Sequence, residues 1–275
     1  MKDILLNDGR KIPEIGFGTY KTTTGGVQDV IPEAIRAGYR HIDTASYYGN
    51  EEAVGDAWSG SGIDRGKFFI TTKLWKTEMG YAETKRAAEE SLRRLRTDYI
   101  DLYLIHWPRP TMDADWRTLD LETWRAMEEL VKEGKVLSIG VSNFLPHHLE
   151  NIISGGSIMP VVDQIEFHPG YMQKDVLAYC RERGILVEAW SPLGRGRVFE
   201  DELLNGLAAK YSVSLAQLCK RFAMQEGVLP LPKSSSMQRM LENMDVFGFE
   251  IDDDDIGAIE AMPETGFSGY HPDKE

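Results

Sequence analysis

The sequence of 275 residues predicts an α/β fold, a (β/α)8 TIM barrel with an N-terminal β-hairpin cap. Short apolar runs alternate with helical patterns along the whole chain, an arrangement typical of a parallel sheet. Eight such units in about 250 residues favour a closed barrel over a doubly wound sheet. Neither Gly16-Phe17-Gly18 nor Gly194-Arg195-Gly196 continues into the Gly-x-Gly-x-x-Gly fingerprint of a Rossmann domain. No linker-like stretch divides the chain, so we expect one barrel domain over residues 1–275.

The elements follow in order from the N-terminus. Residues 4–13 predict a hairpin with Asp8-Gly9 at its turn, placed to cap one end of the barrel. The apolar runs predict strands at 15–18, 39–43, 68–73, 100–105, 136–141, 161–166, 186–190 and 228–231. Helical spacing predicts helices over 86–95, 121–132, 174–183, 214–225 and 249–262, with residues 109–119 as a loop.

Composition excludes several classes of protein. Lys and Arg total 31 against 44 Asp and Glu, and the net charge of −13 makes general binding to nucleic acid unfavourable. Only Cys180 and Cys219 are present, which excludes a disulfide framework and a structural zinc site. No apolar run has membrane-spanning length and no signal segment is visible. We therefore expect a soluble cytoplasmic protein with no membrane or nucleic-acid partner.

Polar side chains follow three neighbouring strands where each strand ends. Asp43 ends the second predicted strand and Tyr48 follows in the next loop, Lys73 ends the third strand, and His106 follows the fourth. Functional groups of a barrel collect at the carboxyl ends of its strands. A single Lys at the end of a strand usually forms an ion pair at the surface, and a single His is usually structural. Four such groups on one rim instead indicate a reactive site.

Several ordered strings make the chain resemble the aldo-keto reductase family from about residue 4 to about residue 265. They are His41-Ile42-Asp43-Thr44-Ala45, Thr72-Lys73-Leu74-Trp75, Ile105-His106-Trp107-Pro108, Gly140-Val141-Ser142-Asn143-Phe144, Gln164-Ile165-Glu166-Phe167-His168-Pro169, Trp190-Ser191-Pro192-Leu193-Gly194 and Leu231-Pro232-Lys233-Ser234. The resemblance implies an NADP(H)-dependent oxidoreductase that reduces aldehydes and ketones. Trp190 is similar to the aromatic of the prokaryotic 2,5-diketo-gluconate reductase branch.

The resemblance assigns catalysis to Asp43, Tyr48, Lys73 and His106. Tyr48 would donate the proton to the forming alkoxide, and we prefer it to Tyr47 because Gly49 follows it, as in the family string. A Lys73 ammonium favours the phenolate, so we expect the pKa of Tyr48 to fall below its ordinary ~10. Asp43 would hold Lys73, and His106 would bond the carbonyl oxygen. A His rather than a Glu at position 106 favours carbonyl over alkene reduction.

The resemblance also implies a cofactor site spread over the strand ends. Ser142, Asn143 and Gln164 would hold the nicotinamide carboxamide, with Asp43 beside them, and Trp190 would stack on the ring. Gly18, Thr19 and Tyr20 would line the same cleft, and Ser191, Leu193 and Gly194 would approach the pyrophosphate. The alternative for Trp190 is that it is an ordinary core aromatic with no role in cofactor binding.

A Ser-rich turn follows the last strand. Lys233, Ser234, Ser235, Ser236 and Arg239 resemble the site for the 2′-phosphate of NADP, with Glu242 and Asn243 facing the adenine. The alternative is an ordinary helix cap with a solvated Arg239. We favour the phosphate site because barrels often bind phosphate after their last strands. NADPH should then bind more tightly than NADH.

The expected substrate pocket is lined by Tyr20, Tyr48, Trp75, His106 and Trp107. Short loops and a short tail after Met262 predict an open site for small carbonyls: sugars, keto acids, methylglyoxal or other reactive aldehydes. Arg195 and Arg197 would attract an acidic substrate or face solvent. Alternatives are a sugar-acid reductase of the 2,5-diketo-gluconate type and a nicotinamide-binding sensor or regulatory subunit with slow turnover. We expect a monomer without a metal, with His147-His148 as a surface feature.

Overall fold

The structure is a computed structural model that describes residues 2–22 and 30–274. Its main sheet has eight strands in the order β10-β9-β8-β7-β6-β5-β4-β3, all with parallel neighbours. They are β3 Phe17–Gly18, β4 His41–Asp43, β5 Phe69–Leu74, β6 Ile100–Ile105, β7 Val136–Ser142, β8 Val162–Glu166, β9 Leu186–Trp190 and β10 Val228–Pro230. Each strand overlaps one of the predicted apolar runs, because strands covered on both faces need apolar residues throughout.

Backbone hydrogen bonds join the first strand of this sheet to the last. The N–H of Gly16 donates to Pro230 O at 3.2 Å, and the N–H of Gly18 donates to Pro232 O at 3.0 Å. A Cβ on Gly16 would lie 2.5 Å from Leu231 Cδ2, so only glycine permits this approach. The sheet therefore curls around to meet itself, and the predicted barrel is confirmed.

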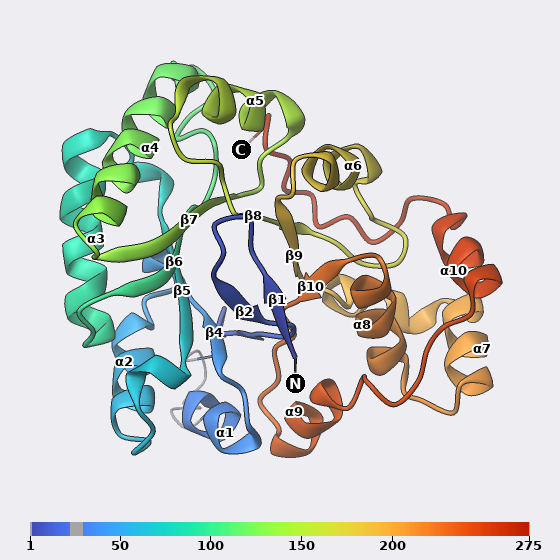
Figure 1. Cartoon of the computed structure of the whole chain (residues 1–275). Helices are drawn as coiled ribbons and strands as arrows, with labels where there is room; N and C mark the ends of the chain where they lie inside the picture. The colour runs from blue at the N-terminus through green and yellow to red at the C-terminus, as the bar shows by residue number, and fades with distance from the viewer. Residues whose placement is uncertain (1, 23–29, 275) are drawn as a thin grey trace.

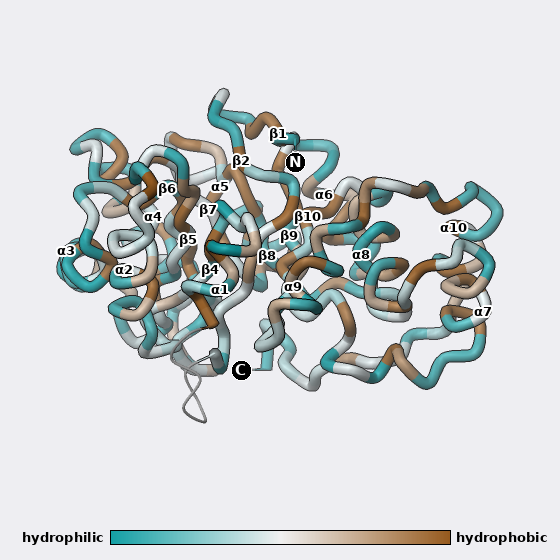
Figure 2. Tube along the Cα trace, turned by 90° about the horizontal axis from the view of Figure 1, so that it is seen from below, coloured by the Kyte–Doolittle hydropathy of each residue, from teal (hydrophilic) through white to brown (hydrophobic). Residues whose placement is uncertain are grey.

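Helices surround the sheet (Figure 1). They are α1 Val30–Ala37, α2 Glu51–Ser59, α3 Tyr81–Leu95, α4 Trp116–Lys132, α5 Pro146–Gly155, α6 Lys174–Glu182, α7 Glu202–Lys210, α8 Leu215–Gln225, α9 Met237–Met244 and α10 Asp253–Glu260. In the hydropathy view the hydrophobic colour concentrates on the strands and the hydrophilic colour on the outer helices (Figure 2). Alternation of strand and helix thus places one apolar core between the barrel wall and its helical coat.

Three helices differ by several residues from their predicted bounds. Helix α3 begins at Tyr81, before the predicted 86–95. Helix α4 begins at Trp116 within the predicted loop 109–119, because the Asp115 carboxylate caps its first turn by accepting from the N–H of Thr118. Helix α10 is shorter than the predicted 249–262. Gln225 holds the backbone of Ile251 through both its amide oxygen and its amide nitrogen, and Asp252 is extended, so the helix begins only at Asp253.

The predicted hairpin is confirmed as β1 Asp3–Leu5 paired antiparallel with β2 Lys11–Pro13. Leu6 and Ile12 are buried against apolar side chains that include Leu102, Leu104 and Leu229 of the barrel. Figure 2 shows the hairpin at one end of the molecule and the C-terminus at the other. The hairpin therefore plugs the amino ends of the strands and leaves the carboxyl ends for a site.

The remaining features of the fold concern the cysteines and the membrane. Cys180 and Cys219 are both buried and neither forms a disulfide. Within residues 2–22 and 30–274, no helix has the length and apolar character needed to cross a membrane.

Candidate active site

A cleft of about 660 Å³ opens at the carboxyl ends of the strands, a size typical of small-molecule sites. Most of the residues predicted for the site line it. They are Gly18, Tyr20, Asp43, Tyr48, Trp75, His106, Trp107, Ser142, Asn143, Gln164, Trp190, Ser191, Leu193 and Lys233. The structure thus brings together side chains that lie more than two hundred positions apart in sequence.

Lys73 is the centre of the predicted tetrad. Its buried ammonium donates to both Asp43 carboxylate oxygens, at 2.7 and 2.8 Å, and to Thr44 O at 2.9 Å. The phenol oxygen of Tyr48 lies 3.4 Å from Lys73 Nζ. The His106 ring meets the Tyr48 ring edge-on, with 5.6 Å between their centroids. The Tyr48 phenol, the Lys73 ammonium, the Asp43 carboxylate and the His106 imidazole therefore converge at the base of the cleft.

The loop after β4 places Tyr48 through a buried hydrogen-bond network. Thr44 Oγ1 donates to Asn50 Oδ1, and Asn50 Nδ2 donates to Thr19 O at 2.8 Å. Between them the chain makes one 3-10 turn, Ser46–Tyr48, which ends at Gly49 with φ of 65°. That left-handed conformation suits glycine, so the Tyr48-Gly49 order in the sequence has a structural cause.

The neighbouring Tyr47 takes a different position. Its side chain is 55% exposed and stacks on Trp75, with ring centroids 3.8 Å apart. Glu78 fixes this pair, because its carboxylate accepts from both Ser46 Oγ and the N–H of Trp75. The geometry therefore places Tyr48, and not Tyr47, against Lys73.

The electrostatics of the tetrad differ in one respect from the sequence expectation. Burial raises the pKa of Tyr48, and the lowering effect of Lys73 does not overcome it. Burial opposes the charge on Lys73, but the interactions with Asp43 and Tyr48 together outweigh burial and the pKa of Lys73 rises. Burial and the Lys73 charge hold the pKa of His106 well below its ordinary value. Near pH 7 the site holds a neutral phenol, an ammonium and a neutral imidazole, so the expected lowering of the Tyr48 pKa is wrong.

A second set of hydrogen bonds connects the predicted nicotinamide residues. Trp190 Nε1 donates to Asn143 Oδ1 at 2.8 Å, and Asn143 Nδ2 donates to His106 O at 3.0 Å. Ser142 Oγ donates to Gln164 O at 2.8 Å. The Trp190 ring is therefore held in a fixed orientation at the cleft wall, where a flat ring could stack on it.

Charge in the cleft is opposite in sign to that of the whole chain. Its described lining has one carboxylate, Asp43, which Lys73 already pairs. The other charged groups of the lining are cationic: Lys21, Lys76, Arg195 and Lys233. Burial and the positive charge of the nearby Lys21 lower the pKa of Lys233. A cationic cleft in an acidic protein fits an anionic ligand such as a dinucleotide.

Several predicted cofactor residues lie outside this lining and stay predictions. They are Thr19, Gly194, Ser234, Ser235, Ser236, Arg239, Glu242 and Asn243. Ser234 Oγ accepts from the N–H of Ser236, which precedes α9. The Asn243 side chain faces inward and accepts from Lys220 Nζ at 2.7 Å. Arg239 lies exposed on α9.

Sequence reasoning missed the contribution of the C-terminal segment. Tyr270 lines the cleft and packs beside Trp107, with ring centroids 6.5 Å apart. The Arg195 guanidinium lies 5.0 Å from the Tyr270 ring and 5.6 Å from the Trp190 ring. The expected open site therefore has a tail residue on its rim. No local signal marks Tyr270, since its partners lie far away in the sequence.

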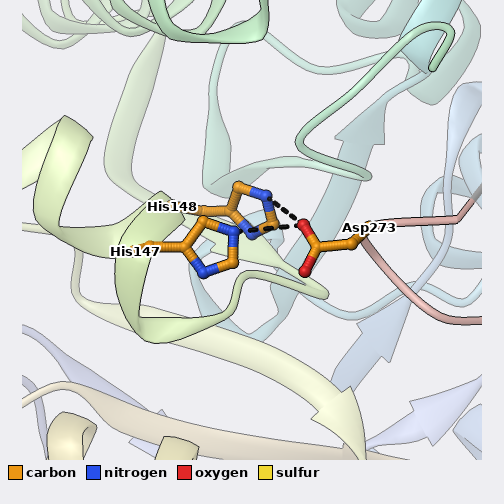
Figure 3. A group of neighbouring side chains, drawn as sticks. All are labelled: His147, His148 and Asp273. Atoms are coloured by element: carbon orange, nitrogen blue, oxygen red, sulfur yellow. Dashed lines mark hydrogen bonds and ion pairs between the residues drawn. The ribbon is translucent and has the colours of Figure 1, made fainter.

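Figure 3 shows the contacts that hold the end of this segment. Asp273 Oδ1 lies 3.1 Å from His147 Nε2 and 3.3 Å from His148 Nε2. The N–H of Leu145 donates to His148 Nδ1, so the neutral ring carries its proton on Nε2, facing Asp273. A metal ion would need the lone pair of that nitrogen, which the proton occupies. The two histidines and Asp273 therefore fit a role in holding the C-terminal segment against α5. His148 is wholly buried, which corrects its expected place on the surface.

Comparison with known proteins gives a family match across most of the chain. A sequence model of the Aldo/keto reductase family matches residues 14–264. Glyoxal reductase of Bacillus subtilis (strain 168) is 43% identical, with 100% of this chain and 98% of that protein covered. Methylglyoxal reductase DkgA of Escherichia coli (strain K12) is 40% identical, covering 98% of this chain and 97% of the relative.

Solved structures agree with these sequence matches. A Gox0644 mutant in complex with NADPH has a TM-score of 0.92 and 43% identity, covering 100% of this chain and 98% of its own. The Bombyx mori aldo-keto reductase in complex with NADP has a TM-score of 0.89 and 35% identity, covering 100% and 99%.

Proposed function

The chain belongs to the aldo/keto reductase family and is an NADP-dependent oxidoreductase, and we propose that it reduces small aldehydes and ketones with Tyr48 as the proton donor. The observation that carries this proposal is the buried Lys73 ammonium, shared between the Asp43 carboxylate and the Tyr48 phenol at the base of the cleft. The relatives named for glyoxal and methylglyoxal support small, reactive carbonyls as the substrate class.

Each tetrad residue has a role that its environment supports. NADPH, when bound, supplies the hydride that reaches the carbonyl carbon. The raised pKa of Tyr48 keeps its phenol protonated, ready to donate to the carbonyl oxygen. The Lys73 ammonium stabilises the phenolate left behind, and Asp43 holds Lys73 in place. Neutral His106 can donate one hydrogen bond to the carbonyl oxygen without carrying a competing charge.

The cationic cleft supports binding of the cofactor. Lys21 and Lys233 offer positive charge to its phosphates, and Trp190 offers a flat surface to the nicotinamide. Arg239, on the first turn of α9, is our candidate for the 2′-phosphate.

The decisive experiment follows NADPH absorbance with glyoxal and methylglyoxal, using wild type, Tyr48→Phe and the matched Tyr47→Phe. We expect Tyr48→Phe to lower kcat by about 10²–10⁴-fold, the usual contribution of a positioned acid. NADPH affinity should stay within a few-fold of wild type. Tyr47→Phe should retain most activity, since Tyr47 is exposed and stacks on Trp75. Substantial turnover by Tyr48→Phe would refute the assignment.

A sugar-acid reductase is a second candidate, favoured by Arg195. Its guanidinium faces two aromatic rings and forms no ion pair with any residue in 2–22 or 30–274. A substrate carboxylate could therefore pair with it. Arg195→Gln should raise KM for 2-oxo acids and leave KM for uncharged aldehydes unchanged. The sensor alternative would show as tight NADPH binding with little turnover of either class.

We further propose that the protein acts as a monomer in the cytoplasm. Two buried free cysteines suit a reducing compartment. The exposed large apolar side chains that the structure describes lie on different elements, such as Leu5 on the hairpin, Met112 after β6 and Leu241 on α9. Light scattering on the purified protein would test this, and a stable dimer would contradict it.

A further inference from the structure

A buried glutamate lies beneath the tetrad, inside the barrel. Glu188 is in the middle of β9 and has no exposed surface. Its Oε2 accepts a hydrogen bond from Gln164 Nε2 at 2.8 Å. The same nitrogen donates to Asp43 Oδ2, also at 2.8 Å. The side-chain amide of Gln164 therefore links Glu188 to the Asp43–Lys73 pair.

These bonds fix the orientation of the Gln164 side chain. Its amide nitrogen is committed to two buried carboxyl groups, so its carbonyl oxygen is the group that remains available. Gln164 lines the cleft, and its Oε1 neither accepts a hydrogen bond from a described residue nor is fully enclosed. An acceptor is thus presented at the cleft, where it suits an N–H donor such as a carboxamide.

The charged and titratable groups around Glu188 come from two neighbouring strands. Asp43 and His41 face it from β4, and Lys73 faces it from β5. Burial and the Asp43 charge raise the pKa of Glu188 to about 8. Burial and Lys73 lower the pKa of His41 to about 3, so that ring stays neutral. Glu188 Oε1 has no hydrogen-bond partner and can carry the proton while Oε2 accepts from Gln164.

We propose that Glu188 is a positioning residue for the cofactor: it holds the Gln164 oxygen toward the bound nicotinamide, and its ionisation shifts the balance between oxidised and reduced cofactor. The inference rests on the proposed function. The oxidised nicotinamide ring is a cation and the reduced ring is neutral. A negative charge beneath the ring therefore stabilises the oxidised form preferentially.

Two variants separate the two effects. Glu188→Gln keeps an oxygen that accepts from Gln164 but removes the proton site. Glu188→Leu removes both. The readout is the dissociation constant of NADPH and of NADP⁺, measured by quenching of intrinsic tryptophan fluorescence from about pH 6.5 to about pH 9, the range around the raised pKa.

In wild type, the affinity for NADP⁺ relative to NADPH should rise several-fold across that range. Glu188→Gln should abolish this rise while binding NADPH at low pH as wild type does. Glu188→Leu should weaken NADPH binding by about tenfold, because Gln164 loses one of the two bonds that orient it. At neutral pH, the infrared spectrum of wild type minus that of Glu188→Gln should show the band of one protonated carboxyl, that of Glu188.

The control is Asp120→Asn on α4, a wholly buried carboxyl outside the barrel whose oxygens accept no hydrogen bond from a described residue. It should leave the pH dependence of both dissociation constants unchanged. A Glu188→Gln protein with the wild-type pH dependence would overturn the inference. If wild type bound neither cofactor form, the proposed function would fail instead. Should Glu188→Leu not fold, Glu188→Gln alone decides.

Discussion

The charge on Lys73 exists because the residues around it make a buried ammonium stable. Its Nζ contacts four oxygen atoms, from Asp43, Thr44 and Tyr48. Desolvating an ion is costly unless its partners satisfy it, and here they do. The same arrangement that makes the phenol a usable acid also ties strands β4 and β5 together.

Lys73→Met should therefore damage both stability and activity. Asp43 would keep a buried negative charge without its partner, and breaking such a pair costs about 3–5 kcal/mol. Urea unfolding monitored by circular dichroism measures the loss. Lys76→Met is the matched control, since Lys76 lines the same cleft, its ammonium lies over the Trp75 ring, and it forms no ion pair with a described residue. A loss below about 1 kcal/mol for Lys73→Met, the range of exposed pairs, would contradict this account of the site.

At the level of single residues, the sequence predicted the tetrad because each member ends a strand or follows one. Glu188 had a signal as well, since a charged residue interrupts the apolar run 186–190. Such a residue in a fully buried strand needs a polar partner inside the barrel. Its partner, Gln164, could not be identified from sequence, because the pairing depends on the register of β8 against β9.

Helix α9 is the element on which the cofactor preference depends. Arg239 is exposed on its first turn and forms no ion pair within the described parts of the chain. Arg239→Ala should raise the dissociation constant of NADPH about tenfold or more, the loss of a hydrogen bond to a charged group. The dissociation constant of NADH should stay the same.

Fluorescence titration with both cofactors measures this difference, and Arg93→Ala on the outer helix α3 provides an exposed arginine far from the cleft as control. Equal affinity of wild type for NADPH and NADH, unaltered by Arg239→Ala, would show that the Ser-rich turn is only a helix cap.

Helix α8 begins with a capping box. Ser214 Oγ accepts from the N–H of Gln217, and Gln217 Oε1 accepts from the N–H of Ser214. Ser214→Ala should lower the free energy of unfolding by about 1 kcal/mol and the Tm by a few degrees, with unchanged kcat. Ser154→Ala is the control, because its hydroxyl bonds only to carbonyls of its own helix. A change in kcat would show that α8 also affects the site.

At the level of elements, strands were predicted better than helix ends. A strand buried on both faces is marked by its apolar run, as β6 is throughout its length. Helix ends depend on partners that lie elsewhere in the fold. Gln225 ends one helix and also delays the start of α10 by holding Ile251, two contacts that local periodicity does not report.

The whole molecule carries less negative charge than its composition suggests. The formal net charge of −13 counts every carboxyl as ionised. Burial, however, raises the pKa of Asp120 well above its ordinary value, and no described group hydrogen-bonds either of its oxygens. In the unfolded chain this carboxyl ionises near its ordinary pKa of ~3.9. Above that pH the unfolded state releases a proton that the folded state keeps.

Stability should therefore fall as pH rises through this window, by about 1.4 kcal/mol per pH unit for this one group, until the folded carboxyl itself ionises. Asp120→Asn removes the titration. Its stability relative to wild type should grow with pH above about pH 5, by the same ~1.4 kcal/mol per unit, until the folded Asp120 carboxyl ionises. Urea unfolding at several pH values measures the difference between the two proteins. Asp254→Asn, an exposed carboxyl on α10, should give a flat difference. A flat difference for Asp120→Asn would mean that Asp120 is ionised in the folded protein, and hence that burial alone does not keep carboxyl groups protonated in this barrel.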